Sequence, residues 1–188
     1  MIDSLYDRAA EENIAVAGLY CDFLSQQEQT ATNIMGAVLK QIVRREGIPE
    51  YLREAFQKGQ KEYGGRGLRL AELMGMLKTT IASLSQVFIC IDALDEFPPK
   101  HLPELLESLR SILRESPRTK IFLTGRPQMA DDVKRYFSKA VVILVSPTPD
   151  DIRHYVEIRL DRDTEPEAMN KDLRADIVRV ILEKISDM

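Results

Sequence analysis

The sequence predicts an α/β protein built on a parallel sheet, with three layers and helices on both faces of the sheet. Four short apolar segments are typical of buried strands, because they lack the alternation of apolar and polar residues that a half-exposed strand shows. Segments with apolar residues at helical spacing separate them, which indicates right-handed crossover connections. The expected strands cover residues 14–24, 86–92, 120–124 and 140–145.

The first half of the chain is expected to place several helices around the first strand. Residues 4–12 are typical of the end of a helix, and Gly47 and Pro49 form a helix stop further on. Residues 64–67, Gly-Gly-Arg-Gly, do not follow an expected strand, so we interpret them as a loop and not as a phosphate cradle. The expected helices cover residues 32–45, 49–63 and 70–84.

The second half is expected to alternate in the same way and then to become helical. Thr148 is a candidate N-cap, with Pro149 at the first helical position and Asp151 where the acid of a capping box falls. Residues 161–172 are polar and acidic and resemble a linker, so we place one domain at 1–160 and the start of a helical region at 161–188. Further helices are expected at residues 105–113, 131–137 and 173–185.

Composition excludes several classes of protein. The 188 residues include 26 Lys and Arg against 30 Asp and Glu, a net charge of −4, which disfavours a nucleic-acid binder held by phosphate contacts. No apolar run approaches the roughly 20 residues of a membrane span, and no signal peptide is evident, so we expect a cytoplasmic protein. Cys21 and Cys90 lie in apolar segments and are expected to be buried thiols, not disulfide or zinc ligands.

Polar residues follow two of the expected strands. Asp92, Asp95 and Glu96 follow the strand over 86–92, in the layout of a Walker B site, where the first acid holds Mg²⁺ and a later one polarises water. Thr124 and Arg126 follow the strand over 120–124, where a guanidinium can reach a terminal phosphate. Ligands of parallel sheets bind at the carboxyl ends of the strands, so the combination indicates an origin among nucleotide-hydrolysing proteins.

The segments VFICIDALDE and KIFLTGRP resemble the Walker B and sensor 1 motifs of NACHT-type STAND P-loop NTPases. The nearest resemblance is to a fungal group that includes heterokaryon-incompatibility factors and carries a nephrocystin-3-like N-terminal segment. AGLYCDFLSQQEQTATNIMGAVLKQ and VVILVSPTPDDIRHYVEIRL are also similar to that group. The resemblance covers nearly the whole chain.

The resemblance implies a set of roles for an intact protein with ATP and Mg²⁺ as cofactors. Asp92 would serve the metal, Asp95 or Glu96 would position water, and Thr124 and Arg126 would contact the nucleotide. It also implies the ASCE strand order 2-3-4-1-5, with protein partners or self-association during signalling. No nucleic acid or membrane partner is implied.

One departure from the family is large. None of the nine glycines is followed by lysine, so the chain has no G-x-x-x-x-G-K-[ST] phosphate loop. We expect the chain to start just after that loop and to lack the first strand, which would lie between residues 120–124 and 140–145. The two strands on either side must then pair directly or leave open edges, and an open edge favours association.

Three functions remain open from the sequence. The first is an incomplete NACHT/STAND domain of a signalling protein, active in interaction and without ATP hydrolysis of its own. The second is an ATP- or GTP-binding switch whose phosphate loop was cut off by the gene model. The third is a non-catalytic α/β domain, acting at most through protein interactions, in which the acids and the arginine only satisfy local structure.

Overall fold

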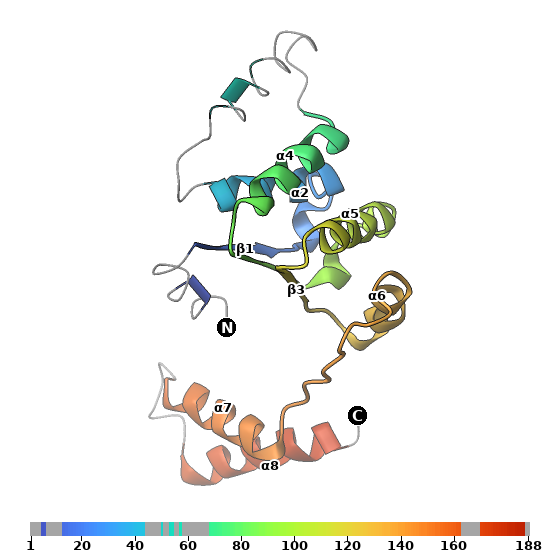
Figure 1. The fold of residues 1–188 in the computed structure, drawn as a ribbon. Coiled ribbons are helices and arrows are strands. Elements are labelled where there is room, and N and C mark those ends of the chain that lie inside the picture. Colours follow the sequence, from blue (N-terminus) through green and yellow to red (C-terminus); the bar gives the residue numbers. More distant parts are fainter. Residues whose placement is uncertain are drawn as a thin grey trace. The chain divides into compact units, whose positions relative to one another are not determined.

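The computed structural model describes residues 5–6, 13–43, 50, 53–54, 57, 68–162 and 170–186. The chain forms two compact units, residues 1–142 and residues 143–188, and each is described by itself. The first unit holds the sheet and the second is a pair of helices (Figure 1). Expectations for residues 7–12, for most of 49–63, for the loop at 64–67 and for much of the linker at 161–172 lie outside the described residues.

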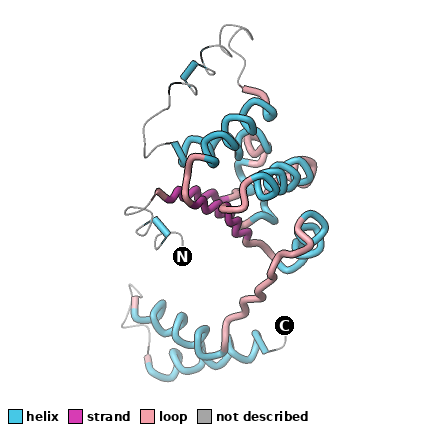
Figure 2. The backbone as a smooth tube through the Cα atoms, in the orientation of Figure 1, coloured by secondary structure: helices cyan, strands magenta, loops and turns pink. Residues whose placement is uncertain are grey.

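The first unit contains a parallel sheet of three strands in the order β1-β2-β3 (Figure 2). The strands are β1 (Ile14–Tyr20), β2 (Gln86–Asp92) and β3 (Thr119–Leu123). Tyr20 pairs with Asp92 and Leu123 pairs with Ile91, so all three strands end at nearly the same level. This confirms an α/β fold with a parallel sheet.

Four helices of this unit are described in full: α2 (Ala31–Val43), α4 (Leu70–Ala82), α5 (Leu102–Glu115) and α6 (Ala130–Tyr136). All four were expected from apolar spacing. Buried residues of α2, α4 and α5 share one core with alternate residues of the sheet, and partly buried residues of α6 pack against it. Fully buried members of this core include Met35, Leu77, Ile89 and Leu105.

The expectation of helices on both faces is met on one face only among the described residues. α2, α4 and α5 all belong to the core on a single side of the sheet (Figure 1). The strand order explains this arrangement. Successive right-handed crossovers that advance in one direction put every connecting helix on the same face, and helices change face only where the order reverses.

The opposite face of the sheet has its own small apolar cluster. Ile14 and Val16 are buried there, and Leu5 and Phe88 pack against them. The rings of Phe88 and Phe122 stack with centroids 6.3 Å apart. Within the described residues, the cover from outside the sheet on this face is therefore the Leu5 side chain.

The two edges of the sheet differ. At β1, the Gln41 side chain accepts from the Gly18 amide and donates to the Gly18 carbonyl, both at 2.9 Å, so a side-chain amide takes the place of a strand. At β3, the Arg118 carbonyl and the Thr124 amide bond to β2. The even-numbered residues of β3 therefore direct their backbone groups toward β2, and the odd-numbered residues direct theirs away from it. The described residues put no strand against that edge of β3.

The prediction of a strand over residues 140–145 is wrong. Residues 140–148 have no regular secondary structure and form the connection that precedes α7 (Figure 2). The apolar side chains of residues 141–145 are exposed. Their β-branched composition favours a strand, but a strand also needs a neighbour to satisfy its backbone groups, and the described residues supply none.

The strand predicted over 14–24 is also too long. β1 ends at Tyr20, and Asp22 caps a 3-10 turn, η1 (Phe23–Ser25), by accepting from the Leu24 amide. Short polar side chains compete with strand hydrogen bonds in this way. Apolarity alone therefore extended the predicted strand into a turn.

The second unit consists of α7 (Pro149–Asp161) and α8 (Lys171–Ser186). The capping box is confirmed, because Thr148 accepts from the Asp151 amide and Asp151 accepts from the Thr148 amide. The Thr148 hydroxyl also donates to the Asp151 carboxylate, and this bond first, then the one from the Thr148 amide, lowers the pKa of Asp151. No helix in the described part of the chain is long and apolar enough to cross a membrane.

The loss of the predicted fourth strand can be tested by comparing two isoleucines. Ile143 is 78% exposed and Ile89 is fully buried in β2. Ile143→Ala should change the free energy of unfolding by less than about 0.5 kcal/mol, whereas Ile89→Ala should lower it by about 2–5 kcal/mol. Chemical denaturation followed by circular dichroism measures both, and a large loss with Ile143→Ala would contradict the exposed position of the segment.

Candidate functional site

The carboxyl ends of β2 and β3 bring all five predicted site residues to the same end of the sheet. Asp92 is the last residue of β2, and Asp95 and Glu96 lie in the 3-10 turn η2 (Leu94–Glu96) that follows it. Thr124 and Arg126 follow β3 directly, ahead of the turn η3 (Pro127–Met129). The register of the sheet places Thr124 level with Asp92.

Asp92 and Thr124 form the centre of the site. The Thr124 hydroxyl donates to one carboxylate oxygen of Asp92 and accepts from the Ala93 amide at 3.0 Å. Two backbone bonds, from the Thr124 amide to the Ile91 carbonyl and from the Leu94 amide to the Thr124 carbonyl, hold the same loops together. The Asp92 carboxylate is therefore oriented by its neighbour strand.

The turn into the acidic segment requires an unusual backbone conformation. Ala93 has φ 54° and ψ 47°, in the left-handed region, and it is the one non-glycine residue with positive φ in the described part of the chain. A residue with a Cβ pays about 1–2 kcal/mol for that conformation. Such local strain is often found at functional sites.

Asp95 connects the acidic turn to the loop after β3. Its carboxylate accepts from the Arg126 amide at 3.2 Å and pairs with the Arg126 Nε at 3.1 Å. The Asp95 side chain is 12% exposed and the Arg126 side chain is 70% exposed. The acid is thus part of the floor of the site, while the guanidinium faces solvent.

Glu96 connects the acidic turn to the loop after β1. Its carboxylate accepts from the Phe23 amide at 3.0 Å, and its backbone carbonyl accepts from the Gln26 side chain at 3.2 Å. The Cys21 amide also donates to the Asp92 carbonyl at 2.9 Å. The three predicted acids therefore make bonds to both neighbouring strands.

The loop after β1 contributes residues that the sequence did not single out. The Asp22 side chain caps η1, and its backbone is bonded on both sides by the Gln29 side chain. The available signal was the position itself, because residues just after any strand of a parallel sheet reach the same edge. The sequence analysis assigns residues 14–24 to a strand and therefore does not place Asp22 in a loop at this end of the sheet.

The cysteines are buried and free, as the sequence predicted. Burial, and then the negative charges of Glu96, Asp92 and Asp95, raise the pKa of Cys21 to about 11. Burial also raises the pKa of Cys90. Neither thiol is therefore a candidate nucleophile.

Mg²⁺ with a nucleotide fits this residue set better than a metal held by protein alone. One Asp92 oxygen has no partner among the described residues, as a water-mediated contact to Mg²⁺ requires. The described part of the chain contains no cluster of three or more His, Cys, Asp or Glu that could hold a metal. A metal here would need phosphate oxygens and water to complete its shell, which is how Mg²⁺ is commonly bound.

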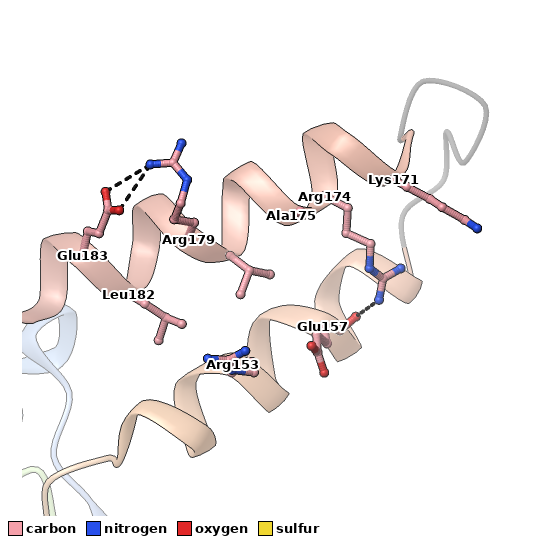
Figure 3. A pocket seen from close by; sticks show the side chains of 9 residues that line it. Arg153, Glu157, Lys171, Arg174, Ala175, Arg179, Leu182 and Glu183 are labelled. Atoms are coloured by element: carbon pink, nitrogen blue, oxygen red, sulfur yellow. Dashed lines mark hydrogen bonds and ion pairs between the residues drawn. The ribbon is translucent and has the colours of Figure 1, made fainter.

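A hollow lies in the helical pair, far from these motifs in sequence. It has a volume of about 550 Å³ between α7 and α8, and none of the predicted site residues lines it (Figure 3). Arg174 donates to the Glu157 carbonyl and Arg179 pairs with Glu183, so half of its cations already have partners. Its charged lining is Arg153, Glu157, Lys171, Arg174, Arg179 and Glu183.

The strain at Ala93 predicts an unusual response to glycine. Ala93→Gly should raise the free energy of unfolding by up to about 1 kcal/mol, because glycine adopts positive φ without a Cβ clash. Ala93→Val should lower it by about 1–3 kcal/mol. As a control, Ala71→Gly in helix α4 should lower it by up to about 1 kcal/mol. Denaturant titration measures all three, and a loss with Ala93→Gly would contradict the conformation.

Cys21 should resist modification in the folded protein. With its pKa near 11, the thiolate fraction at pH 8 is roughly a hundredfold below that of an unperturbed thiol, and the side chain is buried. In a Cys90→Ser background, labelling with a disulfide reagent should be slow for native protein and fast in denaturant. Complete native labelling within the mixing time would contradict the buried placement.

The comparisons with known proteins bear on this edge of the sheet. The family model for the N-terminal region of nephrocystin 3 matches residues 1–126, a span that contains all three strands and ends at Arg126. No curated protein matches the chain. Because the family model covers more than half of the 188 residues and includes every predicted site residue, the chain belongs to the nephrocystin 3 N-terminal family.

Proposed function

We propose that the chain is the magnesium- and phosphate-facing part of a NACHT/STAND nucleotide switch in a signalling protein, of the kind found in fungal incompatibility and innate immunity. It binds ATP and Mg²⁺ only together with a phosphate loop that these 188 residues do not contain, and it does not hydrolyse ATP alone. The observation that carries the proposal is the meeting of Asp92, Thr124 and Arg126 at the carboxyl edge of the sheet.

The charges explain why this half-site needs a second half. Asp92, Asp95 and Glu96 together repel a polyphosphate, and within the described residues Arg126 is the cation paired to this cluster. The amides and lysine of a phosphate loop would supply the missing positive potential. The outward-facing edge of β3 leaves backbone groups on which a strand carrying such a loop can pair.

In the complete site, each residue would act through the geometry it already has. The Thr124 hydroxyl holds one oxygen of Asp92, so the other oxygen would be available to a water bound to Mg²⁺. When bound, Mg²⁺ neutralises charge on the phosphates. Arg126 contributes a planar donor group at the adjacent strand end.

A second candidate is a protein-interaction domain without nucleotide. Tyr20, Phe23 and Leu24 are exposed beside the acidic turn, and the edge of β3 has no neighbouring strand in the described chain. Exposed apolar groups at the end of β1 and an open edge at β3 each favour association with a protein partner or with a second copy. The two candidates differ in whether the function of the protein requires the Asp92 carboxylate.

The test is the melting temperature with and without nucleotide. Binding to the native state stabilises by RT ln(1 + [L]/Kd), so 5 mM ATP with Mg²⁺ should leave the melting temperature of the chain unchanged. A fusion with a strand, a G-x-x-x-x-G-K-[ST] loop and a helix ahead of residue 1 should gain a Mg²⁺-dependent increase of several degrees. Asp92→Asn should abolish that increase, while Asp132→Asn, in an exposed pair on α6, should keep it.

Three outcomes separate the candidates. An Asp92-dependent increase in the unfused chain would show that the chain binds nucleotide by itself and contradict the half-site. A fusion that is folded but does not respond to nucleotide would favour the interaction domain. Turnover by the unfused chain that disappears with Asp92→Asn would support a complete NTPase.

A further inference from the structure

We infer that Asp95 is a positioning residue for Arg126, which it holds by one edge so that the opposite edge of the guanidinium meets a phosphate. The family resemblance implies instead that Asp95 or Glu96 positions water. This inference rests on the proposed function for the identity of the anion, but the geometry of the pair can be tested without any nucleotide.

The Asp95 carboxylate contacts Arg126 at two atoms. One oxygen accepts from the Arg126 backbone amide at 3.2 Å, and the other lies 3.1 Å from the Arg126 Nε. The hydrogen bond to the backbone fixes where the residue starts, and the ion pair keeps the guanidinium beside the carboxylate. Both carboxylate oxygens therefore face Arg126, so the geometry assigns Asp95 to holding the arginine.

The Asp95–Arg126 ion pair is less exposed on its acidic side than an ordinary surface ion pair. Asp95 is 12% exposed, so its carboxylate is mostly shielded from water. In contrast, the pair of Asp132 with Arg135 in α6 spans 3.5 Å between side chains that are 46% and 73% exposed. Exposed pairs of that kind contribute little, because solvent screens them and both side chains must be ordered.

Gly125 allows the close approach of the two loops. A Cβ at Gly125 would lie 3.3 Å from the Asp95 carboxylate oxygen and 3.4 Å from the Met129 side chain. Both distances are tighter than ordinary contacts of a Cβ. The absent side chain between Thr124 and Arg126 therefore lets the carboxylate reach the Arg126 amide.

The remaining donors of Arg126 are available. Arginine has five N–H donors, of which Nε carries one. In the part of the chain that the structure describes, the two Nη atoms have no hydrogen-bond or ion-pair partner, and the side chain is 70% exposed. A guanidinium whose Nε side faces a carboxylate keeps its two Nη atoms available. Together they form the planar donor pair that recognises phosphate with two parallel bonds.

Glu96 does not share this role. Its carboxylate accepts from the Phe23 amide and so orients the loop after β1, on the opposite side of β2 from Arg126. Replacing Glu96 should therefore leave the orientation of Arg126 unchanged. This gives the experiment an acidic control from the same turn.

The first arm of the experiment observes Arg126 directly. In the 188-residue chain labelled with ¹⁵N-arginine, the Nε–Hε signal that disappears in Arg126→Lys belongs to Arg126. Its Nε–Hε group should be more restricted in fast motion than that of Arg135, with a larger ¹⁵N heteronuclear NOE, because Arg126 is paired with a carboxylate that is shielded from water. Asp95→Asn keeps an acceptor for the Arg126 amide but loses the ion pair, so it should remove this difference. Glu96→Gln and Asp132→Asn should leave the Arg126 signal unchanged.

The second arm uses ATP and the fusion protein that carries a phosphate loop. Arg126→Ala should weaken MgATP binding by about 10–100-fold and Asp95→Asn by about 3–10-fold. The double variant should bind as Arg126→Ala does, because Asp95 acts through Arg126. Inorganic phosphate should compete with ATP only weakly, since it lacks the rest of the nucleotide.

The outcomes of the two arms are distinct. An unchanged motional restriction of the Arg126 Nε–Hε group in a folded Asp95→Asn variant overturns the inference, whatever the nucleotide does. Additive losses in the double variant overturn it as well. If the fusion does not bind ATP, the proposed function fails, and the Hε signal of Arg126 alone decides whether Asp95 positions it.

Discussion

The acidic turn after β2 is the constraint on which the functional edge of the sheet depends. Its three carboxylates each bond to a different part of the neighbouring loops: Asp92 to Thr124, Asp95 to Arg126, and Glu96 to Phe23. β2 is the central strand, so a single short turn fixes the loops of both neighbours. Removal of Asp95 or Glu96 would take the protein acceptor from a backbone amide of an adjacent loop, Arg126 or Phe23, and removal of Asp92 would take it from the Thr124 hydroxyl.

This wiring separates groups that can do chemistry from groups that hold the site together. A carboxylate whose lone pairs already accept backbone N–H groups is a poor general base, because protonation would break those bonds. Asp95 is of this kind, because both of its oxygens contact Arg126. Glu96 bonds to the Phe23 amide through one oxygen, and its other oxygen has no partner among the described residues. Asp92 keeps one oxygen free of described partners, and Arg126 keeps its Nη atoms free. The free groups are the ones a magnesium-bound phosphate needs.

The sequence predicted the strands and helices whose evidence is local, and it failed where the evidence is not local. The apolar spacing of α2, α4 and α5 was sufficient, since each helix buries one face. It was not sufficient for residues 140–145, because strand formation depends on a neighbour that composition cannot reveal. The motifs named five residues that the structure brings together at the carboxyl ends of β2 and β3, but the bonds of Asp95 and Glu96 to the neighbouring loops are three-dimensional and could not be read from spacing.

The strand order carries the last consequence. Three strands that advance in one direction place all their right-handed crossovers on one face, so the sheet has a thick helical side and a thin side packed by Leu5 among the described residues. β1 has its edge closed by Gln41, whereas β3 has no such clamp. In open parallel sheets the ligand crevice forms where the strand order reverses, and a reversal here requires a further strand beyond β3. Thr124 and Arg126 follow the end of β3. A strand added beside β3 would therefore build the crevice next to the groups that the acidic turn already holds.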